Sequence, residues 1–449
     1  MDHTHFSSLY PLETRFEELK TLLLYVRTGG VSEIVSMQGV GRTVFLGLLA
    51  YNRTIREKHL GDEADNHHFV LVDFAELKRA KEDEVWKTLF SALLVSLEER
   101  GKKDEHARVK ELFVDAVSYN DSTLLFQGLK SALDYLLLDK HITLVFLFDS
   151  FELYAPSLTS VFLERLRVFQ DRYRYNFSLV FSSSHRLDQL VGHDLSETIT
   201  QLISDHTMYL SIYDEVGYGF LVKFLEKHFA KNISSKMVSE VHLLTGGHAK
   251  LSKVLFEEVF AHDAVDNLRE FAKTNRSVEG VNRQIWQDLF PREQLYLKSV
   301  VQGKKPIDER GEIMDSLRRL QILNNNAEFT ISLLKEYVAQ QSEIDDNDSF
   351  VLREDMGEIL RGDDVVSDVL TKHEYKLLRY FLENSSKVLS RDDIALAAWG
   401  EEKAEVGISD QAIDQLVFRL RRKVEEDPDA PHHILTVKGR GFQFLSSHS

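Results

Sequence analysis

Four short apolar runs in the first half of the chain constrain its fold more than any other feature. They cover residues Ser32–Met37, His67–Phe74, His141–Ser150 and Asn176–Ser184. Runs of this length without polar alternation are typical of strands that are buried on both faces, and the segments between them are long enough for crossover helices. The pattern predicts an α/β domain with a parallel sheet that helices cover on both sides.

Two of the connecting segments show helical spacing of their apolar residues. The first runs from Thr43 to Lys58, directly after the first predicted strand, and the second runs from Glu84 to Arg100. We expect each segment to form one helix. From Asp214 to about Tyr337 helical spacing replaces the strand-like runs, so the second half of the chain belongs to a different kind of domain.

The composition excludes several classes of protein. The 449 residues include no cysteine, which rules out disulfides and thiolate metal sites and suits a reducing cytoplasm. A net charge of −17 argues against a chain that coats nucleic acid indiscriminately, so any DNA contact has to come from a local basic cluster. The acidic N-terminus lacks the apolar segment of a signal peptide, and the longest apolar runs are too short to span a bilayer. We expect a cytoplasmic protein without membrane attachment.

The first predicted strand leads into a glycine-containing loop, SMQGVGRT, which covers Ser36–Thr43. A strand, such a loop and a helix with Thr in its first turn form the arrangement of a phosphate-binding P-loop. In that arrangement backbone N–H groups hold phosphates, Lys contacts the outer phosphates and Thr binds Mg²⁺. Taken alone the match is loose, and an ordinary strand-to-helix turn explains the loop equally well.

Other segments have the order expected around a P-loop. The third predicted strand ends in Asp149, where a Walker B segment carries its metal-binding carboxylate, and the fourth ends in small polar residues, as at a sensor-1 position. TGGHAKL resembles the start of a lid helix, and LYPLETRFEELKTLL resembles the segment that precedes the loop. Together, residues 6 to about 340 resemble the AAA+/STAND superfamily, and especially the origin-recognition-type P-loop ATPases.

This resemblance implies a nucleotide, ATP or ADP, with Mg²⁺, and no other cofactor. The nucleotide-binding residues that it implies are Gly39, Gly41, Arg42, Thr43 and Asp149, of which Thr43 and Asp149 would face the metal ion.

Two departures from the family pattern bear on catalysis. Arg42 stands where these loops carry Lys, and its planar guanidinium does not replace a compact ammonium in a tight loop. Ser150 stands after Asp149, where active members place a water-polarising Glu. Glu152 would point to the same side as Ser150 if the strand continued, and it is either a partial substitute or a solvated turn carboxylate. We expect ATP hydrolysis to be slow or absent.

The last hundred residues carry the most specific signal in the chain. LTKHEYKLLRYFLENSSKVLSRDDIALAAWG is followed by SDQAIDQLVFRLRRKVEEDPDAPHHILTVKGRGFQF. In length and order these segments resemble the OmpR/PhoB-type winged-helix DNA-binding domain of bacterial response regulators. The resemblance implies a first helix opened by Thr371 and Glu374, a second opened by Ser390, a third that reads DNA, and a terminal hairpin that forms the wing.

The spacing within the third helix supports this assignment without the family. One stripe at helical spacing is apolar and predicted to be buried: Ile413, Leu416, Val417, Leu420 and Val424. Another face carries side chains that suit base edges in the major groove, where Gln pairs with adenine and Arg with guanine: Gln411, Gln415, Arg419 and Arg422. Ser409 is a suitable N-cap.

Basic residues at the end of this helix and in the wing suit contacts with phosphates, which fix register more than sequence: Arg421, Lys423, Lys438 and Arg440. By resemblance, DNA-contact positions of the family fall on Gln411, Gln415, Arg419 and Arg421 in the helix and on Thr436 and Lys438 in the wing. Gln415 replaces a residue that is commonly apolar, so the target sequence need not match that of any relative. The basic run Arg421–Lys423 is alternatively an exposed helix end that the helix dipole favours.

The sequence thus predicts a multidomain α/β and α protein. Its expected segments are a degenerate P-loop NTPase domain (1–213), a helical lid (214–275), a first winged-helix module (276–340), an acidic linker (341–349) and an OmpR/PhoB-type domain (350–449). Because no receiver domain stands before the last domain in this sequence, we expect regulation to come from the ATPase-like half.

Our first hypothesis for the function is a transcriptional regulator that binds double-stranded DNA, whose other half senses a nucleotide, forms homo-oligomers or binds a sensor protein. The alternative is an ATP-dependent assembly NTPase, of a defence or mobile-element type, that only docks on DNA.

Overall fold

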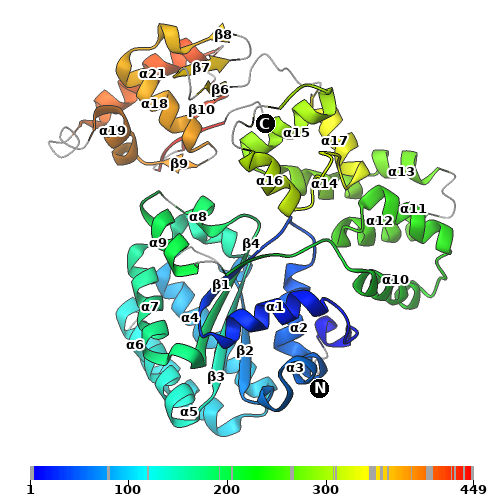
Figure 1. The fold of residues 1–449 in the computed structure, drawn as a ribbon. Coiled ribbons are helices and arrows are strands. Elements are labelled where there is room, and N and C mark those ends of the chain that lie inside the picture. Colours follow the sequence, from blue (N-terminus) through cyan, green and yellow to red (C-terminus); the bar gives the residue numbers. More distant parts are fainter. Residues whose placement is uncertain are drawn as a thin grey trace. The chain divides into compact units, whose positions relative to one another are not determined.

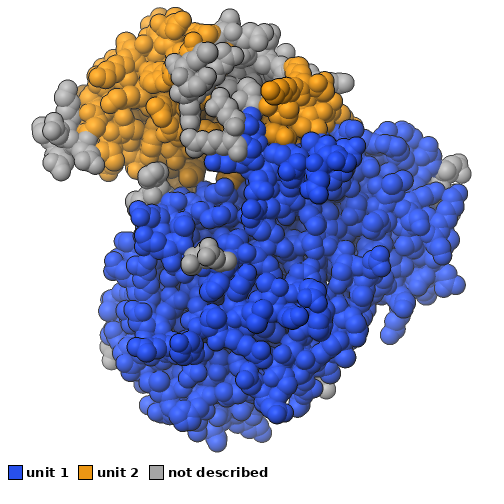
Figure 2. Space-filling view, in the orientation of Figure 1, with its two compact units in different colours: residues 1–288, 308–337 blue, residues 289–307, 338–449 orange. Residues whose placement is uncertain are grey.

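The computed structural model describes most of the chain. The chain divides into two compact units. The described residues are 5–449 except for 78–80, 119–120, 192, 204–205, 263–266, 307, 309–310, 343–349, 354–356, 362–363, 386, 401–407, 426, 429–430, 438–439 and 446–449. One unit contains residues 1–288 and 308–337, and the other contains 289–307 and 338–449 (Figure 2).

The first unit is built around a five-stranded sheet in the order β2-β3-β4-β1-β5, in which every pair of neighbours is parallel (Figure 1). The strands are β1 (Val31–Val35), β2 (His67–Asp73), β3 (Thr143–Asp149), β4 (Phe177–Ser183) and β5 (Thr207–Tyr209). The first four confirm the predicted strands to within two residues at each end. The sequence prediction missed β5, because three residues are too few to show a pattern.

The sheet separates two hydrophobic cores. In β3, Leu144, Phe146 and Phe148 pack into one core, whereas Val145 and Leu147 pack into the other. Because successive side chains of a strand point to opposite faces, a strand between two cores needs an apolar residue at every position. This explains the uninterrupted apolar runs from which the parallel sheet was predicted.

The helices around the sheet are α1 (Phe16–Arg27), α2 (Arg42–Tyr51), α3 (Arg53–Leu60), α4 (Glu82–Glu99), α5 (Lys103–Val117), α6 (Ser122–Leu133), α7 (Ser160–Tyr173), α8 (Leu187–Leu190) and α9 (His193–Ile203). Helix α4 confirms the second predicted helix. No helix in the described part of the chain combines the length and the apolar character that crossing a bilayer requires.

The prediction of a single helix from Thr43 to Lys58 is wrong. Helices α2 and α3 meet at Asn52, whose backbone is extended (φ −93°, ψ 97°). The Asn52 side chain accepts a hydrogen bond from the N–H of Ile55 and donates to the carbonyl groups of Ser8 and Tyr10. The break therefore combines a helix cap with contacts to the N-terminal segment, and helical spacing alone does not reveal it.

After β5 helices replace the strands from Asp214 to about Tyr337, as predicted. The helices are α10 (Glu215–Phe229), α11 (Ser235–Thr245), α12 (Ala249–Ala261), α13 (Leu268–Thr274), α14 (Arg276–Asp288), α15 (Pro291–Gln302), α16 (Glu312–Arg319) and α17 (Ser332–Ser342). An isolated antiparallel bridge joins Leu323 to Phe329. The assignment of residues 276–340 to a first winged-helix module stays a prediction. The predicted linker lies outside the described residues, apart from its first two, which end α17.

In its described residues the C-terminal domain combines two small antiparallel sheets with three α-helices around one core. Its elements are β6 (Phe350–Arg353), β7 (Glu358–Arg361), β8 (Asp364–Val365), α18 (Lys372–Glu383), β9 (Val388–Leu389), α19 (Arg391–Trp399), α21 (Asp410–Val424), β10 (Ile434–Val437) and β11 (Gly441–Phe444). Strands β10 and β11 form the terminal hairpin, and β9 pairs with β11. The three helices and the hairpin confirm the predicted winged-helix fold.

Polar residues at the predicted positions begin these helices. Thr371 and Glu374 form a capping box at the start of α18, in which the Glu374 carboxylate accepts from the Thr371 N–H at 2.8 Å. Ser390 caps α19 in the same way, and the Ser409 hydroxyl accepts a hydrogen bond from the third residue of α21. These caps fix where each helix begins, and so fix which side chains of α21 face outward.

Candidate nucleotide site and candidate DNA interface

The P-loop connects β1 to α2. Gly39 and Gly41 have φ angles of 82° and 104°, in a region that residues with a Cβ rarely adopt. A side chain at position 39 is also excluded by space, because its Cβ would lie 2.8 Å from Cε1 of His248. Gly41 is the N-cap of α2, so the unpaired N–H groups of the first helical turn begin here. This backbone is suited to an anion.

The structure brings Thr43 and Asp149 together. The Thr43 hydroxyl donates to Oδ2 of Asp149 at 2.5 Å, and the other carboxylate oxygen accepts from the backbone N–H of Ser150 at 2.9 Å and from the Ser182 hydroxyl at 3.3 Å. Asp149 is buried. A hydroxyl and a carboxylate at the end of a strand are oxygen ligands that fit Mg²⁺. In the described part of the chain, no group of three or more His, Asp or Glu residues is arranged to hold a metal ion.

Arg42 forms a buried ion pair with Glu152. Its Nη2 donates to Oε1 of Glu152, and the two side chains are only 9% and 14% exposed. Strand β3 ends at Asp149, where Ser150 has a φ of 56° and turns the chain into a short 3₁₀ turn, η5 (Phe151–Leu153). Because the strand ends here, the condition under which Glu152 would point to the same side as Ser150 is not met. Glu152 is also not a solvated carboxylate.

Each member of this ion pair keeps one buried atom that has no hydrogen-bond partner among the described residues. These atoms are Nη1 of Arg42 and Oε2 of Glu152. Burial raises the pKa of Glu152, and the positive charge of Arg42 partly offsets this effect. A buried guanidinium with an unused donor can bind a further anion. Glu152 therefore competes with any phosphate for Arg42.

His248, at the start of α12, holds the lid helices against the P-loop. Its Nε2 lies 2.8 Å from the carbonyl oxygen of Gln38, and its Nδ1 accepts from the backbone N–H of Leu251 at 3.1 Å. Full burial lowers the pKa of His248 to about 4, so the ring is neutral and its proton is on Nε2. The backbone N–H of Lys250 adds a bond to the Gly39 carbonyl at 3.1 Å. His248 directly follows the glycine pair but carries no sequence signal for this role.

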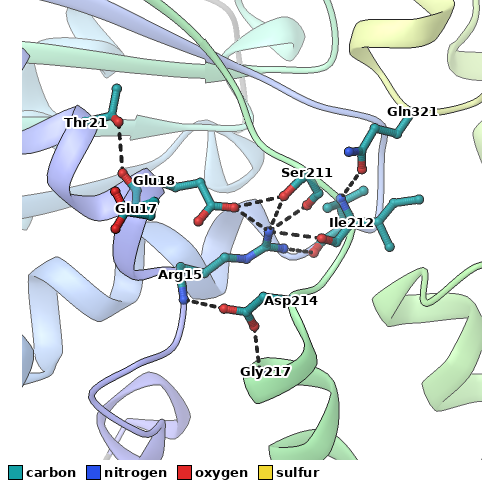
Figure 3. Close-up of polar contacts among 10 residues, drawn as sticks. Arg15, Glu17, Glu18, Thr21, Ser211, Ile212, Asp214, Gly217 and Gln321 are labelled. Atoms are coloured by element: carbon teal, nitrogen blue, oxygen red, sulfur yellow. Dashed lines mark hydrogen bonds and ion pairs between the residues drawn. The ribbon is translucent and has the colours of Figure 1, made fainter. Parts of the chain in front are cut away.

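Arg15 links the N-terminal segment to the connection between β5 and α10 (Figure 3). Its buried guanidinium donates to the Ser211 carbonyl at 2.7 Å and pairs with Glu18 at 3.1 Å. It also reaches the carbonyl of Val40 in the P-loop at 3.4 Å. The backbone N–H of Arg15 donates to Asp214, which caps α10. The P-loop and the connection to the lid thus share one side chain.

The same connection contacts the segment after α16. The backbone N–H of Ile212 donates to Oε1 of Gln321 at 2.7 Å (Figure 3), and the guanidinium of Arg319 lies over the Tyr209 ring. An open cavity of about 730 Å³ borders on this region, between α10 and α11. One of its lining residues, Tyr213, also lies against Gly41 of the P-loop.

In the C-terminal domain, α21 has the two faces that its sequence predicts. The apolar stripe is buried and belongs to the core of the domain: Ile413, Leu416, Val417, Leu420 and Val424. The four polar residues expected at base edges are exposed: Gln411, Gln415, Arg419 and Arg422. The helix therefore presents a polar surface to solvent on the side opposite its core contacts.

Two of the basic residues that were predicted to contact phosphate form hydrogen bonds within the domain instead. Arg421 donates to the Ile434 carbonyl at 2.6 and 2.9 Å and to the Thr436 hydroxyl at 2.8 Å, so it joins α21 to the wing. Lys423 donates to Glu374 at 2.6 Å. Arg440 is exposed. Lys438 and its neighbour Gly439 lie outside the described residues.

Residues 368–444 match the family model described as the C-terminal domain of transcriptional regulatory proteins. The segment is an OmpR/PhoB-type winged-helix domain. A similar curated protein is the regulatory protein VirG of Rhizobium rhizogenes, which is 44% identical over 75 residues, 17% of this chain and 30% of VirG. The chain spans about a third of the length of the curated relatives that it matches.

Two of the similar solved structures cover about three quarters of the chain. The Walker-type ATPase PABY2304 of Pyrococcus abyssi is 14% identical, with a TM-score of 0.49, over 75% of this chain and 97% of that protein. The ORC2 protein of Aeropyrum pernix is 13% identical, with a TM-score of 0.42, over 73% of this chain and 93% of that protein. These similarities are distant, and the P-loop fold with a helical lid rests on the sheet order and the loop geometry described above.

We predict that the stability of the OmpR/PhoB-type domain falls in acid because of Glu374. Burial alone raises the pKa of this carboxyl, but hydrogen bonds from Lys423 and from Thr371 outweigh it and hold the pKa below its ordinary value. A carboxyl with a lowered pKa in the folded state stabilises the fold above its unfolded pKa and loses this effect as the pH falls toward the folded value. We expect a contribution of about 1–3 kcal/mol above pH 5.

Chemical unfolding of the full chain between pH 7 and pH 3.5, followed by hydrogen exchange in α18, measures this contribution. Glu374→Gln should lower the stability at pH 7 and flatten the pH profile. Glu383→Gln is the matched control, because Glu383 is an exposed carboxylate in the same helix that pairs with Arg379. Equal pH profiles for the wild type and Glu374→Gln would show that Glu374 contributes nothing.

Proposed function

We propose that this protein is a DNA-binding transcriptional regulator, and that its P-loop half is a nucleotide- or partner-responsive switch or oligomerisation module. The observation that carries the proposal is the exposed polar face of α21, beside a wing to which Arg421 joins it. Glutamine and arginine on one face of a helix match the hydrogen-bonding pattern of the major groove of double-stranded DNA. The membership of this domain in a family of transcriptional regulatory proteins supports the same function.

The proposal assigns different roles to different basic residues. Arg419 and Arg422 are exposed on the base-reading face of α21 and would contact guanine edges. The Nε of Arg419 also lies 3.6 Å from the carboxylate of Glu374. Arg440 and Lys438 belong to the wing and would contact phosphate, which adds affinity without selecting sequence. Arg421 and Lys423 already bond within the domain. Their main role would be to hold α21 against the wing and against α18, with any phosphate contact in second place.

We predict that Arg419→Ala and Lys438→Ala weaken DNA binding in different ways. Arg419→Ala should cost about 1–3 kcal/mol on the specific site and relax the base preference there, because it removes a contact with a base edge. Lys438→Ala should weaken binding almost equally on all sequences and reduce the salt dependence by about one unit of slope, because it removes a contact with phosphate. Gel-shift titration of the full chain on DNA selected from a random library, at several salt concentrations, measures both effects.

Arg379→Ala serves as the control, since Arg379 is an exposed arginine of α18 that pairs with Glu383. It should bind the selected DNA like the wild type. The regulator proposal is wrong if the wild type binds selected and random DNA equally at physiological salt and Arg419→Ala changes neither.

Nucleotide binding by the P-loop half is the second part of the proposal. ATP or ADP would place phosphates at the N-terminus of α2, against the backbone around Gly39 and Gly41, and Arg42 would contribute its unused donor. Thr43 and Asp149 would hold Mg²⁺. The bound group would supply negative charge that competes with Glu152 for Arg42.

A path from this site to the rest of the unit supports a switch. The P-loop carbonyls of Gln38 and Gly39 are bonded to the start of α12, and that of Val40 to Arg15. Arg15 also bonds to the connection that leads into α10, which Gln321 contacts in turn. A change of the loop on nucleotide binding would therefore reach the lid at two points, the start of α10 and the start of α12. Oligomerisation and a sensor partner remain alternative inputs to the same switch.

The alternative of an ATP-dependent assembly NTPase requires rapid turnover. Ser150 cannot polarise a water molecule as a carboxylate does, and Glu152 is occupied by Arg42. Both features favour slow hydrolysis and hence the regulator. Rapid ATP turnover that DNA stimulates would favour the assembly NTPase instead.

A further inference from the structure

Phe418 is an exposed aromatic residue in the middle of the polar face of α21. Its side chain is 50% exposed. In helical spacing it lies one turn after Gln415 and one turn before Arg422, so it stands between two residues of the base-reading face. Among the described residues, the core of the domain contains the neighbouring Val417 but not Phe418. The fold of the domain therefore does not account for an aromatic side chain here.

We propose that Phe418 recognises the 5-methyl group of thymine in the target DNA. This inference rests on the proposed DNA-binding function. The thymine methyl is the one apolar group that base pairs present in the major groove, and apolar side chains, including Phe, are its usual partners. A phenyl ring has no hydrogen-bonding group, so donors and acceptors of other base edges would be left unpaired beneath it. The ring would thus select thymine by an apolar contact, whereas the polar residues of the same face would select their bases by hydrogen bonds.

The surroundings of Phe418 favour DNA over an apolar protein surface. In helical spacing its neighbours are Asp414 and Gln415 one turn before and Arg421 and Arg422 one turn after. The Asp414 carboxylate is paired with Arg391 at 2.9 Å, and Gln415 and Arg422 are exposed. Covering the ring with an apolar protein surface would bury these last two groups without partners, at a cost in desolvation. A DNA groove offers acceptors to the same groups and negative charge around them.

The test compares thymine with deoxyuridine, which differs only by the absent methyl group. DNA is first selected by the full chain from a random library, and each thymine of the selected site is then replaced in turn. For the wild type we expect about a fourfold loss of affinity at one or two positions, the effect of one buried methyl group. Phe418→Ala should bind the thymine duplex about fourfold more weakly and should show no further loss with deoxyuridine.

Phe418→Leu should keep part of the discrimination, because leucine is also apolar. Leu396→Ala is the matched control, since Leu396 is an exposed apolar residue on α19, and it should discriminate like the wild type. The inference is overturned if wild type and Phe418→Ala lose the same affinity at every deoxyuridine position. It is also overturned if Phe418→Ala leaves DNA binding intact and instead changes the mass of the protein in solution, which would identify a protein interface.

These outcomes are distinct from a failure of the proposed function. If selection yields no DNA that the wild type prefers over random DNA, the regulator proposal fails and this inference fails with it. If a preferred sequence exists and its affinity is insensitive to deoxyuridine, only the role of Phe418 is lost.

Discussion

Replacing Arg15 by alanine should lower the free energy of unfolding of the P-loop unit by about 3–5 kcal/mol, the cost of breaking a buried charged network by removing one partner. The guanidinium is 2% exposed and supplies donors to the carbonyls of Ser211 and Ile212 and to the carboxylate of Glu18. Without it the half-buried carbonyls of Ser211 and Ile212 lose their donor, and Glu18 keeps only the hydrogen bond from the Ser211 hydroxyl. Urea unfolding of the full chain, followed by hydrogen exchange in the sheet strands, measures the loss.

Arg53→Ala is the matched control for this prediction. The Arg53 side chain is 70% exposed and pairs with Glu57 along its own helix, an arrangement worth about 0–1 kcal/mol. Arg15→Lys should fall between the two, because lysine keeps the charge but not the planar arrangement of donors. A loss for Arg15→Ala no larger than that for Arg53→Ala would show that the hydrogen bonds around Arg15 contribute little.

The Arg42–Glu152 pair should control both stability and nucleotide binding. Arg42→Ala should destabilise the unit by about 3–5 kcal/mol, because Glu152 is left buried without a counter-charge, and it should remove nucleotide binding. Glu152→Gln should strengthen nucleotide binding. Once the competing carboxylate is neutral, Arg42 is free for phosphate, and MgATP should bind about tenfold more tightly, which corresponds to about 1.4 kcal/mol. Calorimetric titration of each variant with MgATP measures the change.

The double variant Arg42→Ala/Glu152→Ala separates the two effects. It removes both charges, so it should recover most of the lost stability while nucleotide binding stays absent. Lys87, a half-buried partner of Asp83 on α4, supplies the control Lys87→Ala. Weaker MgATP binding by Glu152→Gln would mean that Glu152 assists the nucleotide rather than competing with it, and the inhibitory role would be wrong.

Much of the fold was predictable because the apolar patterns and helix caps in the sequence coincide with the buried positions and helix starts of the structure. Strand β3 lies between two cores, so burial on both faces left an unbroken apolar run in the sequence. In the C-terminal domain, the buried stripe of α21 and the caps at Thr371 and Ser390 have direct sequence signatures. The predictions failed where tertiary contacts decide. The break at Asn52 depends on bonds to the N-terminal segment, some 42–45 residues away in sequence.

The candidate sites were predictable in part, for related reasons. The carboxyl ends of parallel strands lie at the same edge of a sheet. The sheet topology therefore predicts that Thr43, after β1, lies close to Asp149, at the end of β3. The ion pair between Arg42 and Glu152 depends on the turn of the chain at Ser150. Ser150 has a left-handed backbone, which the sequence pattern did not predict. His248 is a lone histidine in sequence, and its contact with the P-loop exists only in three dimensions.

The position of Arg15 in the chain has a consequence for protein synthesis. Its partners Ser211 and Asp214 are 196 and 199 residues further along the sequence. At about 5–20 residues per second, the ribosome needs roughly 10–40 s to reach them. During that interval the N-terminal segment has left the ribosome without the residues that will bury its arginine. The hydrogen bonds by which Arg15 joins the P-loop to the connection before α10 can therefore form only after the whole sheet, including β5, has been synthesised.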